Sequence, residues 1–160
     1  MGLLEKTPEY ANKLSPKSVT VTRIIFSIVS VIPIIIGVVA RVTSGNWYPL
    51  FIMLGVAIGF FLLGFIWSKK RYQYSRWWYQ DEGLYIQKGV IWRRRILVPK
   101  NRVQHTDVSQ GPLERKFELG QLKVNTAGTK DASVELSGIE LEVANELRNR
   151  LIDETNSDAV

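Results

Sequence analysis

The chain has 160 residues, no cysteine and a formal net charge of +6. The absence of cysteine excludes disulfides, a thiol nucleophile and thiolate metal sites. Up to Arg71 the sequence has eight basic and two acidic residues, and after Arg71 it has thirteen of each. The excess positive charge therefore flanks the apolar segments described below, whereas a nucleic-acid-binding protein carries it on the folded domain. Nucleic acid is not expected as a partner.

Residues 1–22 contain Pro8, Pro16 and scattered polar side chains, which predict a mostly irregular cytoplasmic lead. A cleaved signal peptide is the main alternative, because a basic start precedes an apolar run. Against it, the lead contains Glu5 and Glu9, and a second apolar run follows almost at once.

Two apolar stretches, Ile24 to Ala40 and Trp47 to Trp67, contain no charged residue. As helices they would be roughly 25 and 31 Å long, enough to cross a bilayer. A pair of buried core helices in a soluble protein is the alternative, but the remaining residues are too few to cover helices that are apolar on every side. The sequence predicts a two-span hairpin over residues 23–68, with antiparallel helices because the polar gap between them is short.

Small residues within the spans favour close helix packing. The candidates are Gly37 in the first span and the pair Gly55 and Gly59, four residues apart, in the second. Packing within the hairpin is favoured over dimerisation, and a homo-oligomer is left open.

The orientation follows from the basic flanks. These are Lys6, Lys13, Lys17 and Arg23 before the first span, and Lys69, Lys70, Arg71 and Arg76 after the second. Since the connecting loop contains Arg41 as its one charge, both termini are expected in the cytoplasm, in a multi-pass protein of the plasma membrane. The spans contain none of the ionisable groups on which ion and proton pathways depend, so the hairpin is interpreted as an anchor.

After the spans the pattern becomes strand-like, and residues 69–153 are predicted to form one cytoplasmic domain. The expected strands are Tyr72–Gln80, Leu84–Ile86, Arg93–Val98, Arg102–Ser109, Gln121–Ala127 and Ser133–Leu136, with a short helix after Gly111 and turns at Asp81–Gly83 and Gly128–Asp131.

A C-terminal helix completes the domain. Ser137 and Glu140 have capping-box spacing, and Glu146 faces Arg150 one turn further on. An apolar stripe is formed by Leu141, Ala144, Leu147 and Leu151. Residues 154–160 are expected to be a disordered tail. The predicted fold is a membrane α-helical hairpin plus an α+β domain, with an antiparallel bent sheet or open barrel of six to seven strands capped by the C-terminal helix.

Three segments carry a family resemblance: G-L-Y-I-Q-K-G-V-I-W-R-R-R-I-L-V-P-K-N-R-V-Q from Gly83, V-S-Q-G-P-L-E-R-K-F-E-L from Val108, and V-N-T-A-G from Val124. They resemble the bacterial pleckstrin-homology (PH) domain family and, with two preceding spans, its small YdbS-like membrane proteins. The resemblance implies a PH-like barrel at the cytoplasmic face of a bacterial cell membrane, often alongside a larger relative with several such domains. It implies no established ligand.

The chain departs from the family pattern at two places. A Gly often stands where this chain has Glu118, so the turn before Gly120 is a place where the local structure can differ. Phosphoinositide-binding PH domains use a basic loop after the first strand, but here that loop is Asp81-Glu82-Gly83. This difference argues against transferring the phosphoinositide site.

The strongest candidate contact patch for headgroups or a partner is Trp92 with Arg93, Arg94 and Arg95, to which the junction residues Lys69, Lys70 and Arg71 are added. Guanidinium groups pair with phosphate, and indole rings prefer the headgroup layer. The simpler alternative is a solvated strand with one Arg packed along it.

No catalytic, cofactor or metal site is predicted. His105 is the one histidine and has no second ligand at metal-binding spacing, and phosphate-binding loops and nucleophile elbows are absent from the sequence. Asp107, Glu114 and Glu118 are expected to form surface ion pairs with Arg115 and Lys116 and not to act as acids or bases.

The leading hypothesis is a non-catalytic, membrane-anchored interaction module that binds a partner membrane protein, anionic headgroups or both. A second hypothesis, which rests on family analogy, is an accessory subunit of a transporter or envelope-protection complex, including resistance to membrane-active peptides, that acts through its spans. Exchanging the hairpin for an unrelated one separates the two, since only the second requires these particular spans.

Overall fold

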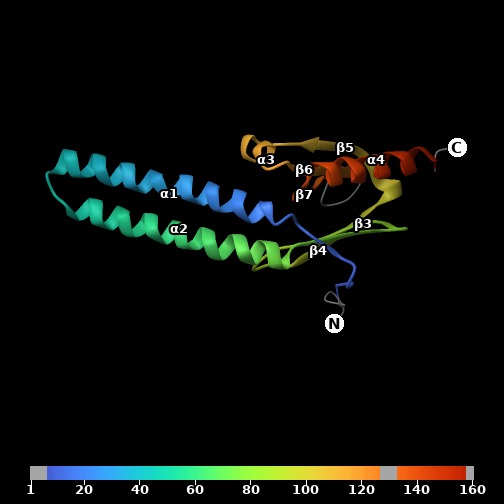
Figure 1. Ribbon diagram of the computed structural model, residues 1–160, viewed down its shortest axis with the longest axis horizontal. Coiled ribbons are helices and arrows are strands. Elements are labelled where there is room, and N and C mark those ends of the chain that lie inside the picture. Colours follow the sequence, from blue (N-terminus) through green and yellow to red (C-terminus); the bar gives the residue numbers. More distant parts are fainter. Residues whose placement is uncertain (1–6, 127–132, 158–160) are drawn as a thin grey trace. The chain divides into compact units, whose positions relative to one another are not determined.

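The computed structural model describes residues 7–126 and 133–157. Figure 1 shows two long helices followed by strands and a C-terminal helix. In chain order the elements are β1 (Asn12–Lys13), α1 (Lys17–Ser44), α2 (Tyr48–Tyr74), β2 (Arg76–Gln80), β3 (Gly83–Lys88), β4 (Arg94–Pro99), the 3-10 helix η1 (Lys100–Arg102), β5 (Val103–Ser109), α3 (Pro112–Lys116), β6 (Leu119–Thr126), β7 (Ser133–Glu140) and α4 (Leu141–Ser157). They belong to two compact units, one of residues 19–70 and one that combines the described residues up to 18 with those from 71 onward.

The first unit is the predicted hairpin. α1 and α2 lie side by side, joined by a short loop in which Gly45 takes a positive φ of 68° (Figure 1). Each helix contains an 18-residue window with a mean hydropathy of 2.5, of which 11% is buried. Helices in the core of a soluble protein would be largely buried, so these helices have the length, composition and exposure of membrane spans.

The second unit contains two antiparallel sheets, one of four strands in the order β1-β2-β3-β4 and one of three in the order β5-β6-β7. In the part of the chain that the structure describes, the sheets do not join into a closed barrel. α4 contacts β5, β6 and β7. This arrangement confirms the predicted hairpin plus antiparallel α+β domain, with an open sheet arrangement and a C-terminal helix.

One apolar core fills the second unit. Leu84, Val98 and Leu122 are fully buried strand residues, and α4 adds Ala144, Leu147 and Leu151 from its predicted apolar stripe. On the exposed side of α4, the Arg150 guanidinium donates to the Glu146 carboxylate at 2.7 Å, as the spacing predicts. The helix therefore packs through one face and is solvated on the other.

The lead is more ordered than the sequence predicts. Asn12 and Lys13 pair with Trp77 and Arg76 of β2, and the Leu14 side chain, 4% exposed, belongs to the core. The Ser15 amide donates to the Gly138 carbonyl of β7 at 2.8 Å. Strand pairing of two residues uses backbone groups and leaves no side-chain pattern, so it could not be predicted from the sequence.

Helix α2 continues beyond the apolar run. Residues 72–74, predicted as the start of a strand, form its last turn, and β2 begins only at Arg76. No Gly or Pro interrupts residues 65–74, and Lys, Arg and Gln are good helix formers. Basic side chains also interact favourably with the C-terminal end of a helix. The alternation of aromatic residues was misleading here.

The C-terminal helix begins and ends later than predicted. Ser137 and Glu140 do not cap it, because β7 extends to Glu140 and pairs there with Leu119 of β6. α4 then runs to Ser157, so residues 154–157 are helical and not a disordered tail. Residues 158–160 and the predicted turn Gly128–Asp131 lie outside the described residues.

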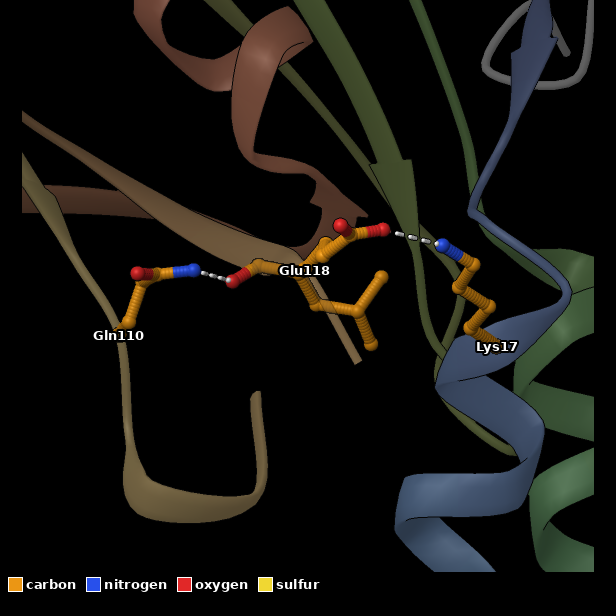
Figure 2. Close-up of polar contacts among 4 residues, drawn as sticks. Lys17, Gln110 and Glu118 are labelled. Carbon is orange, nitrogen blue, oxygen red and sulfur yellow. Dashed lines mark hydrogen bonds and ion pairs between the residues drawn. The ribbon is translucent and has the colours of Figure 1, made fainter. Parts of the chain in front are cut away.

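Glu118 keeps the backbone conformation that favours glycine. Its φ is 56°, the one positive value of a non-glycine residue in the described part of the chain. Figure 2 shows its carboxylate against the Lys17 ammonium, at 3.0 Å, while Gln110 donates to the neighbouring Leu119 carbonyl at 2.6 Å. For Glu118 the expected ion pairing with Arg115 and Lys116 is replaced by this long-range pair.

Glu118→Gly is expected to raise the free energy of unfolding by up to about 2 kcal/mol. Relief of the left-handed conformation is worth roughly 1–2 kcal/mol, and the exposed ion pair with Lys17 at most about 1 kcal/mol. Glu118→Ala, which loses the pair but keeps the strain, is the matched control and should be slightly destabilising. Denaturant unfolding of both variants checks this, and equal destabilisation by both substitutions would contradict it.

Candidate membrane-contact site

The turn between β3 and β4 presents apolar side chains to solvent. Ile91 is 71% exposed and Trp92 is 82% exposed. Gly89 enters the turn with a φ of 118°, and a Cβ added there would lie 1.8 Å from the Trp92 carbonyl oxygen. Only glycine fits this position, so the backbone fixes the two apolar residues at the end of the hairpin.

The three arginines that follow do not form a single cluster. The Arg93 guanidinium lies over the Tyr74 ring, 4.4 Å from its centroid. Arg95 lies 5.3 Å from the Trp78 ring centroid and donates to the Gln87 side chain at 3.3 Å. Arg93 and Arg95 are thus held by cation–π contacts with aromatic rings. A guanidinium group in such a contact can still donate hydrogen bonds from its edge.

Arg94 is exposed, as Arg93 is, but it differs in sitting directly opposite Lys88 in the β3–β4 ladder. Like charges placed opposite each other in a sheet are destabilising. In residues 7–126 and 133–157, no carboxylate forms an ion pair with Lys88, Arg93 or Arg94. The turn therefore combines exposed apolar side chains with basic groups that no carboxylate balances in the described part.

The predicted junction residues Lys69, Lys70 and Arg71 differ in their contacts. Lys69 and Lys70 are exposed and belong to the hairpin unit. Arg71 belongs to the sheet-bearing unit, where its guanidinium donates to the Ser137 hydroxyl at 2.7 Å. Arg71 thus has a structural partner, whereas the two lysines are free to contact headgroups or solvent.

β2 and β3 carry a second aromatic feature, in which the Trp78 side chain is only 3% exposed. The Trp78 and Tyr85 rings stack with centroids 5.2 Å apart and an interplanar angle of 5°. The Tyr85 hydroxyl donates to the Glu82 carboxylate, which raises the pKa of Tyr85 above its ordinary value. The acidic turn Asp81–Gly83 is therefore tied to its own sheet and offers no basic surface for a phosphate.

The hairpin glycines fall into two groups. A Cβ at Gly37 would lie 2.8 Å from the Met53 side chain of α2, so Gly37 sits at the contact between the spans. Gly64 makes the equivalent contact with Phe26, 2.4 Å from its Cβ. A Cβ at Gly55 or Gly59 would have no atom within 4 Å, so these two do not pack against α1. Gly37 and Gly64 rather than the Gly55 and Gly59 pair allow the close approach.

The remaining surface of residues 7–126 and 133–157 includes a cleft and the single histidine. The cleft between β1, β2 and α4, about 290 Å³ in volume, is lined by Tyr10, Trp77 and the Glu146–Arg150 pair among others. His105 is exposed on β5. No three potential His, Cys, Asp or Glu ligands converge on a metal position in the described residues.

Two residues of the turn were not predicted from the sequence. Ile91 and Lys88 flank the predicted patch. The sequence feature that could have identified this turn as a contact surface is the apolar run Val90-Ile91-Trp92 directly after Gly89, because a hairpin turn is normally polar.

A model of the bacterial PH domain family matches residues 19–155. The UPF0699 transmembrane protein YdbS of Bacillus subtilis (strain 168) is 33% identical over 145 residues, which cover 88% of this chain and 89% of that protein. The chain belongs to the bacterial PH domain family. The resemblance inferred from Gly83 to Gly128 is thereby confirmed. No solved structure matches this bacterial PH domain protein.

The family match begins at residue 19 and so includes the hairpin as well as the sheets. Together with the two long apolar helices and a transmembrane relative, it identifies this bacterial PH domain protein as a membrane protein. Membership of this family supports a non-catalytic, membrane-associated role.

Proposed function

We propose that this protein is a membrane-anchored interaction module whose PH-like domain lies on the cytoplasmic face of the bacterial cell membrane. There the domain binds a partner membrane protein, anionic headgroups or both. A larger relative with several PH domains is the kind of partner that the family resemblance suggests, and self-association of this chain is the alternative.

One observation carries the proposal: the hairpin is inserted into the domain. Asn12 and Lys13, which precede α1, pair with β2, which follows α2. Leu14 shares a core with residues as distant as Leu151. If the hairpin crosses the membrane, both of its ends must emerge on the same side, because one folded unit contains both connecting segments.

The charge distribution supports the cytoplasmic side. Lys13, Lys17 and Arg23 precede the first span, and Lys69 and Lys70 follow the second, whereas Arg41 is the one charge near the opposite loop. Positive residues are retained on the cytoplasmic side of bacterial membranes. Within the hairpin, Arg23 lies 4.4 Å from the Phe65 ring centroid and donates to Ser68 at 3.3 Å, which positions its charge at the basic end.

Co-purification from intact membranes tests the role of the basic turn. In the triple variant Arg93→Ala, Arg94→Ala, Arg95→Ala, we expect loss of the bound anionic lipid or of the protein partner that the unaltered chain retains. The matched control removes three other exposed basic residues, Arg102, Arg115 and Lys116. Unchanged lipid and protein partners in the first variant would exclude the turn as the binding surface.

The alternative, an accessory subunit that acts through its spans, is favoured by the open space beside Gly55 and Gly59. These glycines are on α2 but are not used by α1, so a helix of another protein could approach them closely. Replacing residues 23–68 with an unrelated hairpin of equal length distinguishes the two functions. Retained partner binding favours the cytoplasmic module, and lost binding favours the spans.

A further inference from the structure

We infer that the turn between β3 and β4 is a membrane wedge, defined as residues 90–92. Val90, Ile91 and Trp92 insert into the inner leaflet, and the surrounding Lys88, Arg93 and Arg94 bind the headgroups of anionic lipids. This inference rests on the proposed cytoplasmic position of the domain and specifies what one of its surfaces contacts.

The wedge contains the most exposed apolar side chains of the described part of the sheet-bearing unit. Ile91 and Trp92 are the two most exposed large apolar side chains among the described residues of the sheet-bearing unit, at 71% and 82%. The others, Tyr10, Leu97 and Ile152, lie apart in the sequence and are less exposed. Single exposed apolar residues are ordinary, but adjacent ones at the end of a hairpin indicate a contact with an apolar phase.

The backbone holds the wedge in shape. The positive φ of Gly89 and its close approach to the Trp92 carbonyl fix both ends of the turn, and the Arg93 guanidinium is held against Tyr74. A fixed turn loses little conformational entropy when it inserts, so a small apolar surface can suffice.

The charges around the wedge favour an anion. Lys88 and Arg94 oppose each other across the ladder, and among the described residues the Lys88 ammonium donates to a main-chain oxygen, that of Glu135 at 3.4 Å. Because the described residues offer these cations no carboxylate partner, an external anion would remove the repulsion between them. Phosphates of anionic lipids supply that charge at the same depth as an inserted indole.

A short length of chain links the last apolar residue of the spans to the aromatic ring that holds Arg93. Tyr74 lies seven positions after Trp67, the end of the apolar run, and at about 1.5 Å per residue this separation is roughly 10 Å of helix. Tyr74 is the residue on which Arg93 rests. Because the spans tether the domain, insertion is an intramolecular event with a high effective concentration, which favours the bilayer over a protein as the occupant.

The absence of native cysteine allows a direct test. Ile91→Cys, labelled with an environment-sensitive fluorophore, is reconstituted as the full-length chain into phosphatidylcholine vesicles with or without phosphatidylglycerol. Lipids that carry a quencher in the acyl chain report insertion. The control is Asp81→Cys, an exposed residue in the turn between β2 and β3. We expect several-fold stronger quenching at residue 91 than at residue 81 in the vesicles that contain phosphatidylglycerol.

A second variant tests whether insertion depends on the basic residues beside the wedge. Lys88→Ala with Arg94→Ala, introduced beside the label at residue 91, should reduce the quenching in anionic vesicles towards the value in neutral ones. Equal quenching at residues 91 and 81 would contradict the insertion of residues 90–92 into the bilayer. Equal quenching in neutral and anionic vesicles would contradict the binding of anionic lipids. Either result would leave the cytoplasmic position of the domain standing, because that position is measured separately with terminal reporters in cells.

Discussion

Replacing Leu14 with alanine is expected to lower the free energy of unfolding of the sheet-bearing unit by about 2–5 kcal/mol, the range for large-to-small substitutions in a packed core. Leu14 is 4% exposed and belongs to the same core as Trp77 and Ile139, although it precedes the first span. Such a loss is a large fraction of the 5–15 kcal/mol that is typical of a domain. Denaturant unfolding of the full-length protein in detergent, followed by tryptophan fluorescence, measures it.

Lys13→Ala is the matched control, because Lys13 is the exposed neighbour of Leu14 in the same segment. Its effect should stay within about 0.5 kcal/mol, as for most surface substitutions. If Leu14→Ala were as mild as Lys13→Ala, the lead would only lie on the surface of the domain. In that case one folded unit would not contain both ends of the hairpin.

Replacing Gly64 with valine is expected to separate the two spans. A Cβ at this position would lie 2.4 Å from the Cβ and 2.7 Å from the Cγ of Phe26, so even one added carbon requires the helices to move apart. Overpacking of this kind is destabilising by about 1–3 kcal/mol in ordinary cores, and a branched side chain adds more atoms to accommodate. The thermal stability of the hairpin in detergent should drop markedly.

The matched control is Gly59→Val, on the same helix and with nothing within 4 Å of its added Cβ. It should leave the stability of an isolated chain almost unchanged. A second test is Phe26→Ala, which should restore part of the stability lost in Gly64→Val by making room for the valine. Equal effects of valine at residues 59 and 64 would show that the spans do not pack through Gly64.

Much of the fold was readable from the sequence because its signals are physical and local. The spans follow from uninterrupted apolar runs of helical length, and α4 follows from an apolar stripe at helical spacing. Alternating side chains placed β6 within two residues of its observed start, Leu119. Where a pattern repeated over several turns or strand positions, the prediction was close.

Other features depend on contacts that a one-dimensional pattern does not contain. β1 is held by backbone pairing of two residues. α2 continues to Tyr74 because no Gly or Pro ends it earlier, and no sequence feature marks this end. Glu118 adopts a glycine-like conformation that its side chain does not predict. Ser137 and Glu140 had a capping pattern by chance, because strand pairing of β7 continues through both.

The candidate site was predicted in composition but not in arrangement. The sequence identified Trp92 and the three arginines, yet it could not show that Arg93 and Arg95 rest on Tyr74 and Trp78 while Arg94 opposes Lys88. Likewise the glycine pair in α2 suggested contact between the spans, but the relative rotation of the two helices decides which glycines meet the neighbour. Gly37 and Gly64 do, and Gly55 and Gly59 do not.

The most direct test of the proposed architecture is the sidedness of three positions in living cells. Reporters that are active on only one side of the membrane are placed before residue 7, in the loop at Gly45 and after Val160. The proposed topology predicts cytoplasmic signals at both ends and an external signal at Gly45. An external signal at either end, or a cytoplasmic signal at Gly45, would contradict a hairpin anchor with its PH-like domain inside the cell.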